Sequence, residues 1–177
     1  MEIKDSYELP LPKERVWAAL NDEVFLKKSI PWCEKLERRS ETELAAEVKL
    51  KIGPMSTRFT GSITLSDIDP PNGYTITGSG KGGIAGAASG SAKVKLVEAK
   101  DTSSTTLSYE VSAQVKGKIA QLGSRLIQST AKKLSKNFFG SFVQQLEDIN
   151  KANKTTLSVQ KYLDIASLVA KKGVSVG

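Results

Sequence analysis

The chain of 177 residues contains no histidine, one cysteine and no proline after Pro71. The absence of histidine excludes Ser-His-Asp and Cys-His catalysis, together with the commonest general base near neutral pH. The single thiol, Cys33, is too few ligands for a zinc site and cannot form an internal disulfide, which favours a reducing cytoplasm. No pair of acids stands out as a tuned acid and base. We therefore predict no catalytic residue, no metal and no covalent cofactor.

Long apolar segments are also missing. No apolar run approaches the ~20 residues that a helix needs to cross a bilayer, and the first residues, Met1 to Ser6, alternate in polarity as a strand does rather than forming the apolar core of a signal peptide. The length fits one domain. We expect a cytoplasmic protein that is at most peripheral to the inner membrane.

Positive charge is concentrated in the C-terminal third. Residues 1–115 carry 15 Lys and Arg against 16 Asp and Glu, whereas residues 116–177 carry 11 against 3. A basic helix suits an anionic membrane face, and it also suits an acidic protein, a nucleic acid or plain solvent exposure. Among these we predict an anionic membrane or a protein partner and no nucleic acid.

The polarity pattern predicts seven strands and two short helices before a long helix. Hairpins without intervening helices exclude a doubly wound parallel sheet, so the fold class is α+β. The helices are expected at 13–20 and 22–30. The strands are expected at 2–9, around 36, and at 44–52, 57–65, 74–78, 84–97 and 105–116.

The span from Lys118 to Ile149 reads as one amphipathic helix, with Leu122, Leu126 and Leu134 on its apolar face. After Leu134 the apolar positions slip around the helix, which predicts a kink near residues 135–140. A long helix over a curved sheet encloses space, and such space is where small proteins hold hydrophobic ligands. The alternative is a helix packed on a filled core.

Six glycines crowd the segment Gly78–Gly90. A phosphate-binding loop is excluded because a strand follows in place of a helix. Continuing the parity of the strand 84–97 backwards leaves the inner face nearly bare, which predicts either a void for a ligand or a bent hairpin that lets the helix pack closely. Strand parity and the helix face together predict these ligand-binding residues: Phe59, Ile63, Tyr74, Ile76, Ile84, Gly86, Ala88, Tyr109, Leu122, Leu126 and Phe138.

The C-terminal tail has its own pattern. We expect residues 1–149 to form the ligand-binding domain and residues 150–177 to form a polar linker, ending near Thr156, and a short amphipathic helix. This helix would dock on a membrane, on a partner or on its own domain. The predicted membrane or partner surface comprises Lys132, Lys133, Lys136, Tyr162, Leu163, Lys171 and Lys172.

The segment Gly117–Ile127, with the sequence GKIAQLGSRLI, resembles the CoxG family of carbon monoxide dehydrogenase proteins. Further pieces that look like this family are Ile30-Pro31 before Cys33-Glu34, Val48–Pro54, Phe59–Ile63 and the glycine run. The similarity covers residues 1–149. The family usually shows Pro-Gly-Cys where Pro31-Trp32-Cys33 stands here.

This resemblance implies the helix-grip fold of the START and birch-pollen-allergen superfamily, with a cavity between the sheet and the long helix. It also implies an association with CO-dehydrogenase-type oxidoreductases, membrane recruitment and a bound respiratory quinone. From it we expect a non-catalytic carrier of a quinone or lipid-like molecule. The alternatives are a membrane-recruitment adaptor without ligand, and a cyclase or hydrolase on the same fold.

Overall fold

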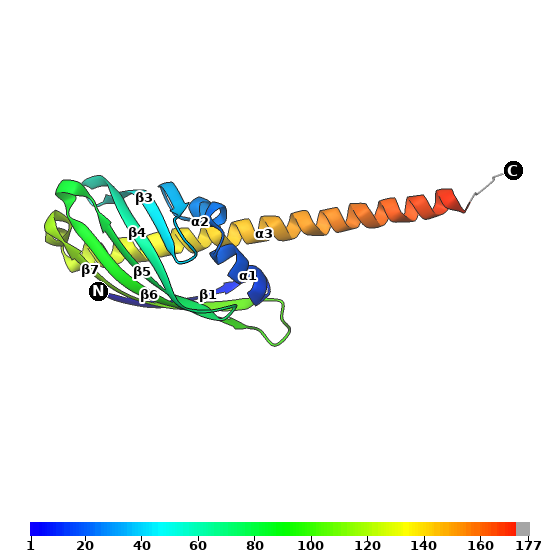
Figure 1. The fold of residues 1–177 in the computed structure, drawn as a ribbon, viewed down its shortest axis with the longest axis horizontal. Coiled ribbons are helices and arrows are strands. Elements are labelled where there is room, and N and C mark those ends of the chain that lie inside the picture. Colours follow the sequence, from blue (N-terminus) through cyan, green and yellow to red (C-terminus); the bar gives the residue numbers. More distant parts are fainter. Residues whose placement is uncertain (173–177) are drawn as a thin grey trace. The chain divides into compact units, whose positions relative to one another are not determined.

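The computed structural model describes residues 1–172 and divides the chain into two units, residues 1–143 and residues 144–177. The first unit contains one seven-stranded antiparallel sheet in the order β1-β7-β6-β5-β4-β3-β2, which curves around the first part of α3 (Figure 1). The predicted α+β class is confirmed. The strands are β1 (Glu2–Leu9), β2 (Cys33–Arg38), β3 (Glu43–Ile52), β4 (Met55–Asp69), β5 (Gly73–Lys81), β6 (Ala87–Glu98) and β7 (Thr105–Lys116).

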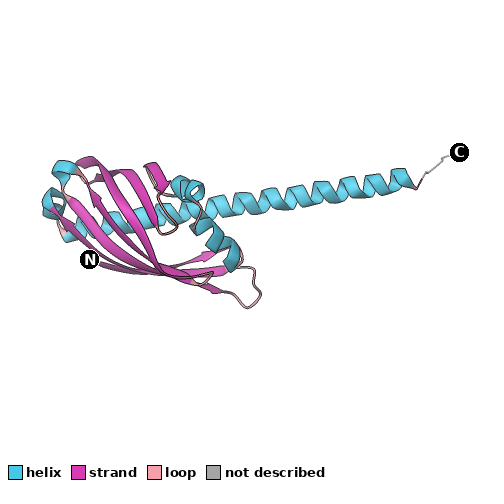
Figure 2. Ribbon diagram, viewed as in Figure 1, coloured by secondary structure: helices cyan, strands magenta, loops and turns pink. Residues whose placement is uncertain are grey.

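The helices connect and cover this sheet (Figure 2). Two short ones follow β1 as expected, and α2 starts where the Asp22 side chain accepts a hydrogen bond of 3.0 Å from the backbone N–H of Phe25. The long helix is preceded by a 3₁₀ turn, so it begins later than the predicted Lys118. The helices are α1 (Lys13–Leu20), α2 (Glu23–Ser29), η1 (Gly83–Ala85), η2 (Gly117–Leu122) and α3 (Ser124–Lys171).

Two separate clusters of buried side chains form the core of the first unit. At one end, Phe142 of α3 is fully buried and its ring lies 5.0 Å from that of Phe25, with Leu9, Val16 and Leu107 also fully buried. At the other end, Phe59, Ala85 and Ile119 form a smaller buried cluster. The helix is therefore held at both ends of the sheet by apolar contacts, and the inner face between them is left for other use.

The helix α3 is continuous through the predicted kink. The prediction placed Leu126 on the inner face, but the buried residue is its neighbour Ile127. Starting from Ile127, the residues Ala131, Leu134, Phe138 and Phe142 recur at spacings of four, three, four and four, which is one stripe on an unbroken helix. The apparent slip of phase came from choosing the wrong residue at its start.

The predicted linker, residues 150–156, is helical and belongs to α3. No proline or glycine lies between Gly140 and Lys171 to stop the helix. Threonine hydroxyls that could compete for the backbone instead bond within the helix, from Thr155 to the carbonyl of Lys151 and from Thr156 to that of Ala152, each at 3.0 Å. The predicted tail extends to residue 177, and its last five residues lie outside the described part of the chain.

The sixth strand begins at Ala87, three residues later than predicted. Residues Gly83–Ala85 form η1 instead, and this turn leaves Ile84 82% exposed rather than inward. Gly86 has φ of +113°, and a Cβ there would lie 1.9 Å from the carbonyl oxygen of Lys116. The parity extrapolated from Val94 therefore fails before Ala87, because the backbone turns there.

Tyr74 predicts how this core responds to alkaline pH. Burial raises the pKa of Tyr74 to about 12, whereas an unfolded tyrosine titrates near ~10. The stability is fully present below pH ~10, and it falls by on the order of 2 kcal/mol towards pH 12, because only the unfolded chain loses the proton. We expect urea unfolding at pH 9 to 11.5 to show a shallower fall in Tyr74→Phe. Tyr162→Phe, at a 72% exposed position, is the control, and equal slopes in all three proteins would contradict the prediction.

Candidate functional site

The inner face of the first unit carries a cavity with two apolar lobes. The first lobe has a volume of about 290 Å³ and the second about 340 Å³, and they share Val48 and Leu50 in their walls. The first lobe is lined by Ile30, Pro31, Val48, Leu50, Ala92, Val94, Leu107, Tyr109, Val111, Leu134, Ser135, Phe138 and Phe139. The second is lined by Ala46, Val48, Leu50, Ile52, Phe59, Gly61, Ser62, Ile63, Gly78, Ser79, Gly80, Ala88, Val115, Ile119 and Ile127.

Small residues and the distance of the helix create this space. Along its backbone α3 approaches the strands only at isolated positions. Gly78, Gly80 and Ala88 line the second lobe without filling it, so inward-facing aliphatic residues such as Val48 and Val115 remain half-buried. A filled core would bury them completely. The arrangement matches the void among the two predicted alternatives, at Gly78, Gly80 and Ala88.

Few side chains that can form hydrogen bonds reach the cavity. In the first lobe they are those of Tyr109 and Ser135. In the second lobe Ser62 and Ser79 contribute to the wall, but alternation with inward-facing Ile63 turns their exposed side chains to the outer face of the sheet. The cavity therefore suits a largely apolar molecule with a small polar end.

Two tyrosines adjoin the first lobe. Tyr109 of β7 is buried, and the ring of Tyr7 of β1 stacks at 4.2 Å on Phe139 of α3. Burial raises the pKa of Tyr7, and the negative charge of Asp5 and a hydrogen bond between the side chains of Tyr7 and Tyr109 raise it further. Tyr7 is therefore a neutral phenol, and hence a hydrogen-bond donor, throughout the neutral range.

The structure brings five of the eleven predicted ligand-binding residues to the cavity. Tyr109 and Phe138 line the first lobe, whereas Phe59, Ile63 and Ala88 line the second. These positions share an inward strand parity or lie on the inner stripe of α3.

The other six predicted residues lie elsewhere. Tyr74 is in the core, where its hydroxyl donates to the carbonyl of Leu20 at 3.4 Å, and Leu122 packs on the cluster around Phe59. The Leu126 side chain lies against Gly53 in the turn between β3 and β4. Three more positions are absent from both walls: Ile76, Ile84 and Gly86.

Several lining residues were not selected from the sequence although a signal existed. The inward parity of β3 and β7 is regular, so Ala46, Val48, Leu50, Val111 and Val115 could have been chosen by that rule. Ile30 and Pro31 follow α2 in a loop, where no periodic signal applies. Their place in the first lobe depends on how α2 packs against β2.

The turn after Pro31 shows how the departure from Pro-Gly-Cys is accommodated. Trp32 has φ of +52° and is 57% exposed. This left-handed conformation is one that glycine adopts without steric cost, whereas a tryptophan adopts it at a cost of ~1–2 kcal/mol. The turn is thus kept, and an exposed aromatic side chain is added beside the first lobe.

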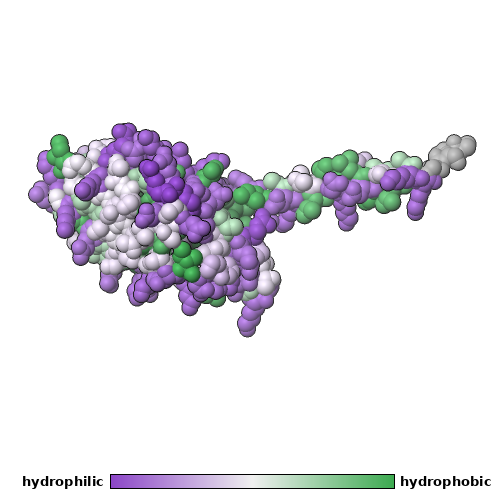
Figure 3. Space-filling model, in the orientation of Figure 1, coloured by the Kyte–Doolittle hydropathy of each residue, from purple (hydrophilic) through white to green (hydrophobic). Residues whose placement is uncertain are grey.

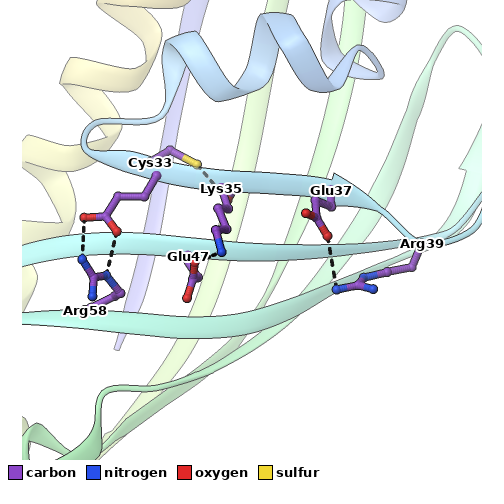
Figure 4. Close-up of polar contacts among 7 residues, drawn as sticks. Cys33, Lys35, Glu37, Arg39, Glu47 and Arg58 are labelled. Carbon is purple, nitrogen blue, oxygen red and sulfur yellow. Dashed lines mark hydrogen bonds and ion pairs between the residues drawn. The ribbon is translucent and has the colours of Figure 1, made fainter.

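The outer surface of β2 to β4 carries ion pairs and the single thiol (Figure 4). Arg58 donates two hydrogen bonds to Glu34, at 2.6 and 3.1 Å, and both residues are exposed, which makes the pair a small contribution to stability. Cys33 donates to the carbonyl of Lys35 at 3.3 Å, and burial raises the pKa of the Cys33 thiol. A raised thiol pKa disfavours the reactive thiolate.

The helical second unit exposes many apolar side chains (Figure 3). Tyr162, Ile165 and Val169 lie on one side of the helix and are 72%, 54% and 55% exposed. The predicted surface residues Leu163, Lys171 and Lys172 are also exposed here, and the predicted Lys132, Lys133 and Lys136 are exposed in the first unit. Over residues 1–172, no helix is long and apolar enough to cross a membrane.

Solved structures share this architecture. A START superfamily protein from Mycobacterium smegmatis matches with a TM-score of 0.63 at 11% identity, covering 84% of this chain and 98% of that one. The ZhuI aromatase/cyclase from Streptomyces sp. R1128 matches with a TM-score of 0.59 at 13% identity, covering 83% and 93%. The fold is therefore the START-like helix-grip fold, which its members generally use to bind hydrophobic ligands.

Sequence comparison then gives the family. Residues 6–147 match the carbon monoxide dehydrogenase CoxG family. A conserved protein from Geobacillus kaustophilus is 30% identical, with a TM-score of 0.79 over 84% of this chain and 96% of that one. No curated protein matches this chain. The chain belongs to the carbon monoxide dehydrogenase CoxG family, as its sequence resemblance indicated.

Ala88→Leu tests whether the second lobe is empty space. The larger side chain should fill the lobe and change the free energy of unfolding by less than ~1 kcal/mol, whereas overpacking a filled core costs ~1–3 kcal/mol. It should also abolish binding of a menaquinone analogue. Thermal unfolding and fluorescence titration measure the two effects.

Gly86→Ala is the matched control for Ala88→Leu. It adds bulk two residues away, at a position outside the cavity whose backbone φ of +113° is strained for any side chain. It should lower the melting temperature and leave the affinity of the folded protein unchanged. A large loss of stability in Ala88→Leu would instead show that the lobe is packed.

Proposed function

We propose that the protein is a non-catalytic carrier of a hydrophobic small molecule, a prenylated quinone or a similar lipid-like molecule. The observation that carries this proposal is the two-lobed cavity between β3–β7 and α3. Its walls are aliphatic and aromatic apart from Tyr109 and Ser135. The carrier would be cytoplasmic and would deliver its ligand at the membrane to an oxidoreductase of the CO-dehydrogenase type.

The side chains around the cavity argue for binding rather than catalysis. An activated nucleophile needs a base within hydrogen-bond reach. Over residues 1–172, Tyr109 interacts with a second phenol, and the Ser135 hydroxyl has no basic side chain bonded to it. This favours a carrier over the cyclase or hydrolase alternative, although one structural relative is an aromatase/cyclase.

Binding can be tested directly on the purified protein. Native mass spectrometry of protein as isolated should show a bound isoprenoid or lipid, and titration with a short-chain menaquinone should be saturable at one molecule per chain. Ala88→Leu should abolish both signals. Absence of binding to the wild-type protein, with a cavity that stays accessible to small apolar probes, would contradict the carrier function.

A membrane-recruitment adaptor without ligand is the second candidate, and the exposed apolar side chains of the second unit favour it. Residues 150–172 carry five lysines and one aspartate. Each lysine near an anionic surface contributes about 1 kcal/mol to binding. The carrier and the adaptor share this membrane contact, and only the carrier requires the cavity.

The membrane contact gives a separate prediction. Removing residues 158–177 should weaken binding to phosphatidylglycerol vesicles and leave the melting temperature of the first unit unchanged. Lys171→Gln with Lys172→Gln should weaken binding by about tenfold or more, and the affinity of the wild-type protein should fall as salt rises. Lys93→Gln with Lys95→Gln removes the same charge from β6 and is the control. Unchanged cosedimentation of the truncated protein would show that the tail docks on protein instead.

A further inference from the structure

Three aromatic rings from three elements meet beside the first lobe. Tyr7 comes from β1, Tyr109 from β7 and Phe139 from α3. The ring centroids of Tyr7 and Tyr109 are 6.3 Å apart with planes 7° from parallel, and Tyr109 lies 5.6 Å from Phe139 at 15°. Because Tyr7 pairs with Leu107 in the sheet register, Tyr7 and Tyr109 are diagonal neighbours on the inner face. This packing fixes where both phenol hydroxyls lie.

The hydrogen bonding of the two phenols leaves one donor for a ligand. The bond between their side chains favours the protonated form of Tyr7, so Tyr7 donates and the oxygen of Tyr109 accepts. The proton of the Tyr109 hydroxyl is then free to be donated. Among residues 1–172 no further hydrogen bond involves this hydroxyl, and the nearby Asp5 carboxylate accepts from the backbone N–H of Ser6 at 2.8 Å.

The surroundings of Tyr109 define what it can recognise. Its neighbours in the wall are aliphatic or aromatic, such as Val111, Leu134 and Phe138. A donor in an apolar site is unfavourable until an acceptor arrives, so a ligand with an acceptor at this point is preferred over one without. The rest of the ligand must be apolar, since the second lobe continues from the shared residues Val48 and Leu50.

We propose that the Tyr109 hydroxyl donates a hydrogen bond to a carbonyl oxygen of the ligand head group, and that Tyr7 is the positioning residue that orients this hydroxyl. The head group occupies the first lobe and the apolar chain occupies the second. The ligand class is a planar carbonyl-bearing ring with a prenyl chain. This inference rests on the proposed carrier function and assigns the polar end of its site.

The test compares two probes that differ only in their carbonyl groups. Menaquinone with two isoprenoid units is one probe, and the corresponding prenylated methylnaphthalene without oxygen is the other. Binding of each is titrated on the full chain. Tyr109→Phe should weaken the quinone by about three- to tenfold, the worth of one neutral hydrogen bond, and leave the naphthalene unchanged. Tyr74→Phe removes a hydroxyl outside both lobes and should change neither affinity.

Tyr7→Phe tests the positioning role. The ring stack on Phe139 is kept in this variant, so the affinity for the naphthalene should be unchanged, whereas the ratio of quinone to naphthalene affinity should fall. The infrared carbonyl band of bound menaquinone gives a second readout. It should lie at lower frequency in the wild-type protein than in Tyr109→Phe, with Tyr7→Phe in between.

The outcomes separate this inference from the carrier function. Equal loss of both probes in Tyr109→Phe would assign the residue to packing and overturn the inference, as would unchanged binding of both. In either case the carrier function stands, because the wild-type protein binds. If the wild-type protein binds neither probe, the carrier function itself falls. If Tyr109→Phe does not fold, the infrared band of Tyr7→Phe decides, and a band identical to wild type overturns the assignment.

Discussion

The fully buried ring of Phe142 and its contacts with Phe25, Phe138 and Phe139 fix α3 to one end of the sheet, and most other features of the first unit depend on that anchor. At the other end, the smaller cluster around Ile119 completes the attachment. A helix held at two ends of a curved sheet spans the concavity between them. The middle of the inner face is covered without being filled, which is how a chain of this size keeps both a stable core and a cavity.

The cavity and the core use different residue sizes for this reason. Large side chains gather where the helix touches the sheet, while Gly78, Gly80 and Ala88 line the space where it does not. The cost is that inward-facing aliphatic residues lose packing partners, which a ligand with an apolar chain would restore. Binding and folding are thus linked, because a molecule that fills both lobes completes the interior and stabilises the folded state.

Much of the fold followed from the sequence because its signals are local. Period-two alternation located the strands, and Pro12, Asp22 and Pro31 located the short helices. The errors occurred where one element's geometry depends on another. Ile84 was placed inward by extending a strand through η1, and Leu126 was chosen in place of Ile127 because both give plausible apolar stripes until the sheet selects one. The polar segment 150–156 was read as a linker, although nothing in it stops a helix.

The sequence by itself determined the class, the order of elements, the lack of histidine chemistry and the family, since these depend on composition and short-range pattern. Tertiary structure alone decided which inward residues face empty space and which face core. Tyr74 and Tyr109 have the same type and the same inward parity, yet one is packed on Trp17 and the other lines the first lobe. The physical reason is that a void is defined by the distance between the helix and the sheet, and this distance is set by the buried aromatic side chains at one end of the sheet.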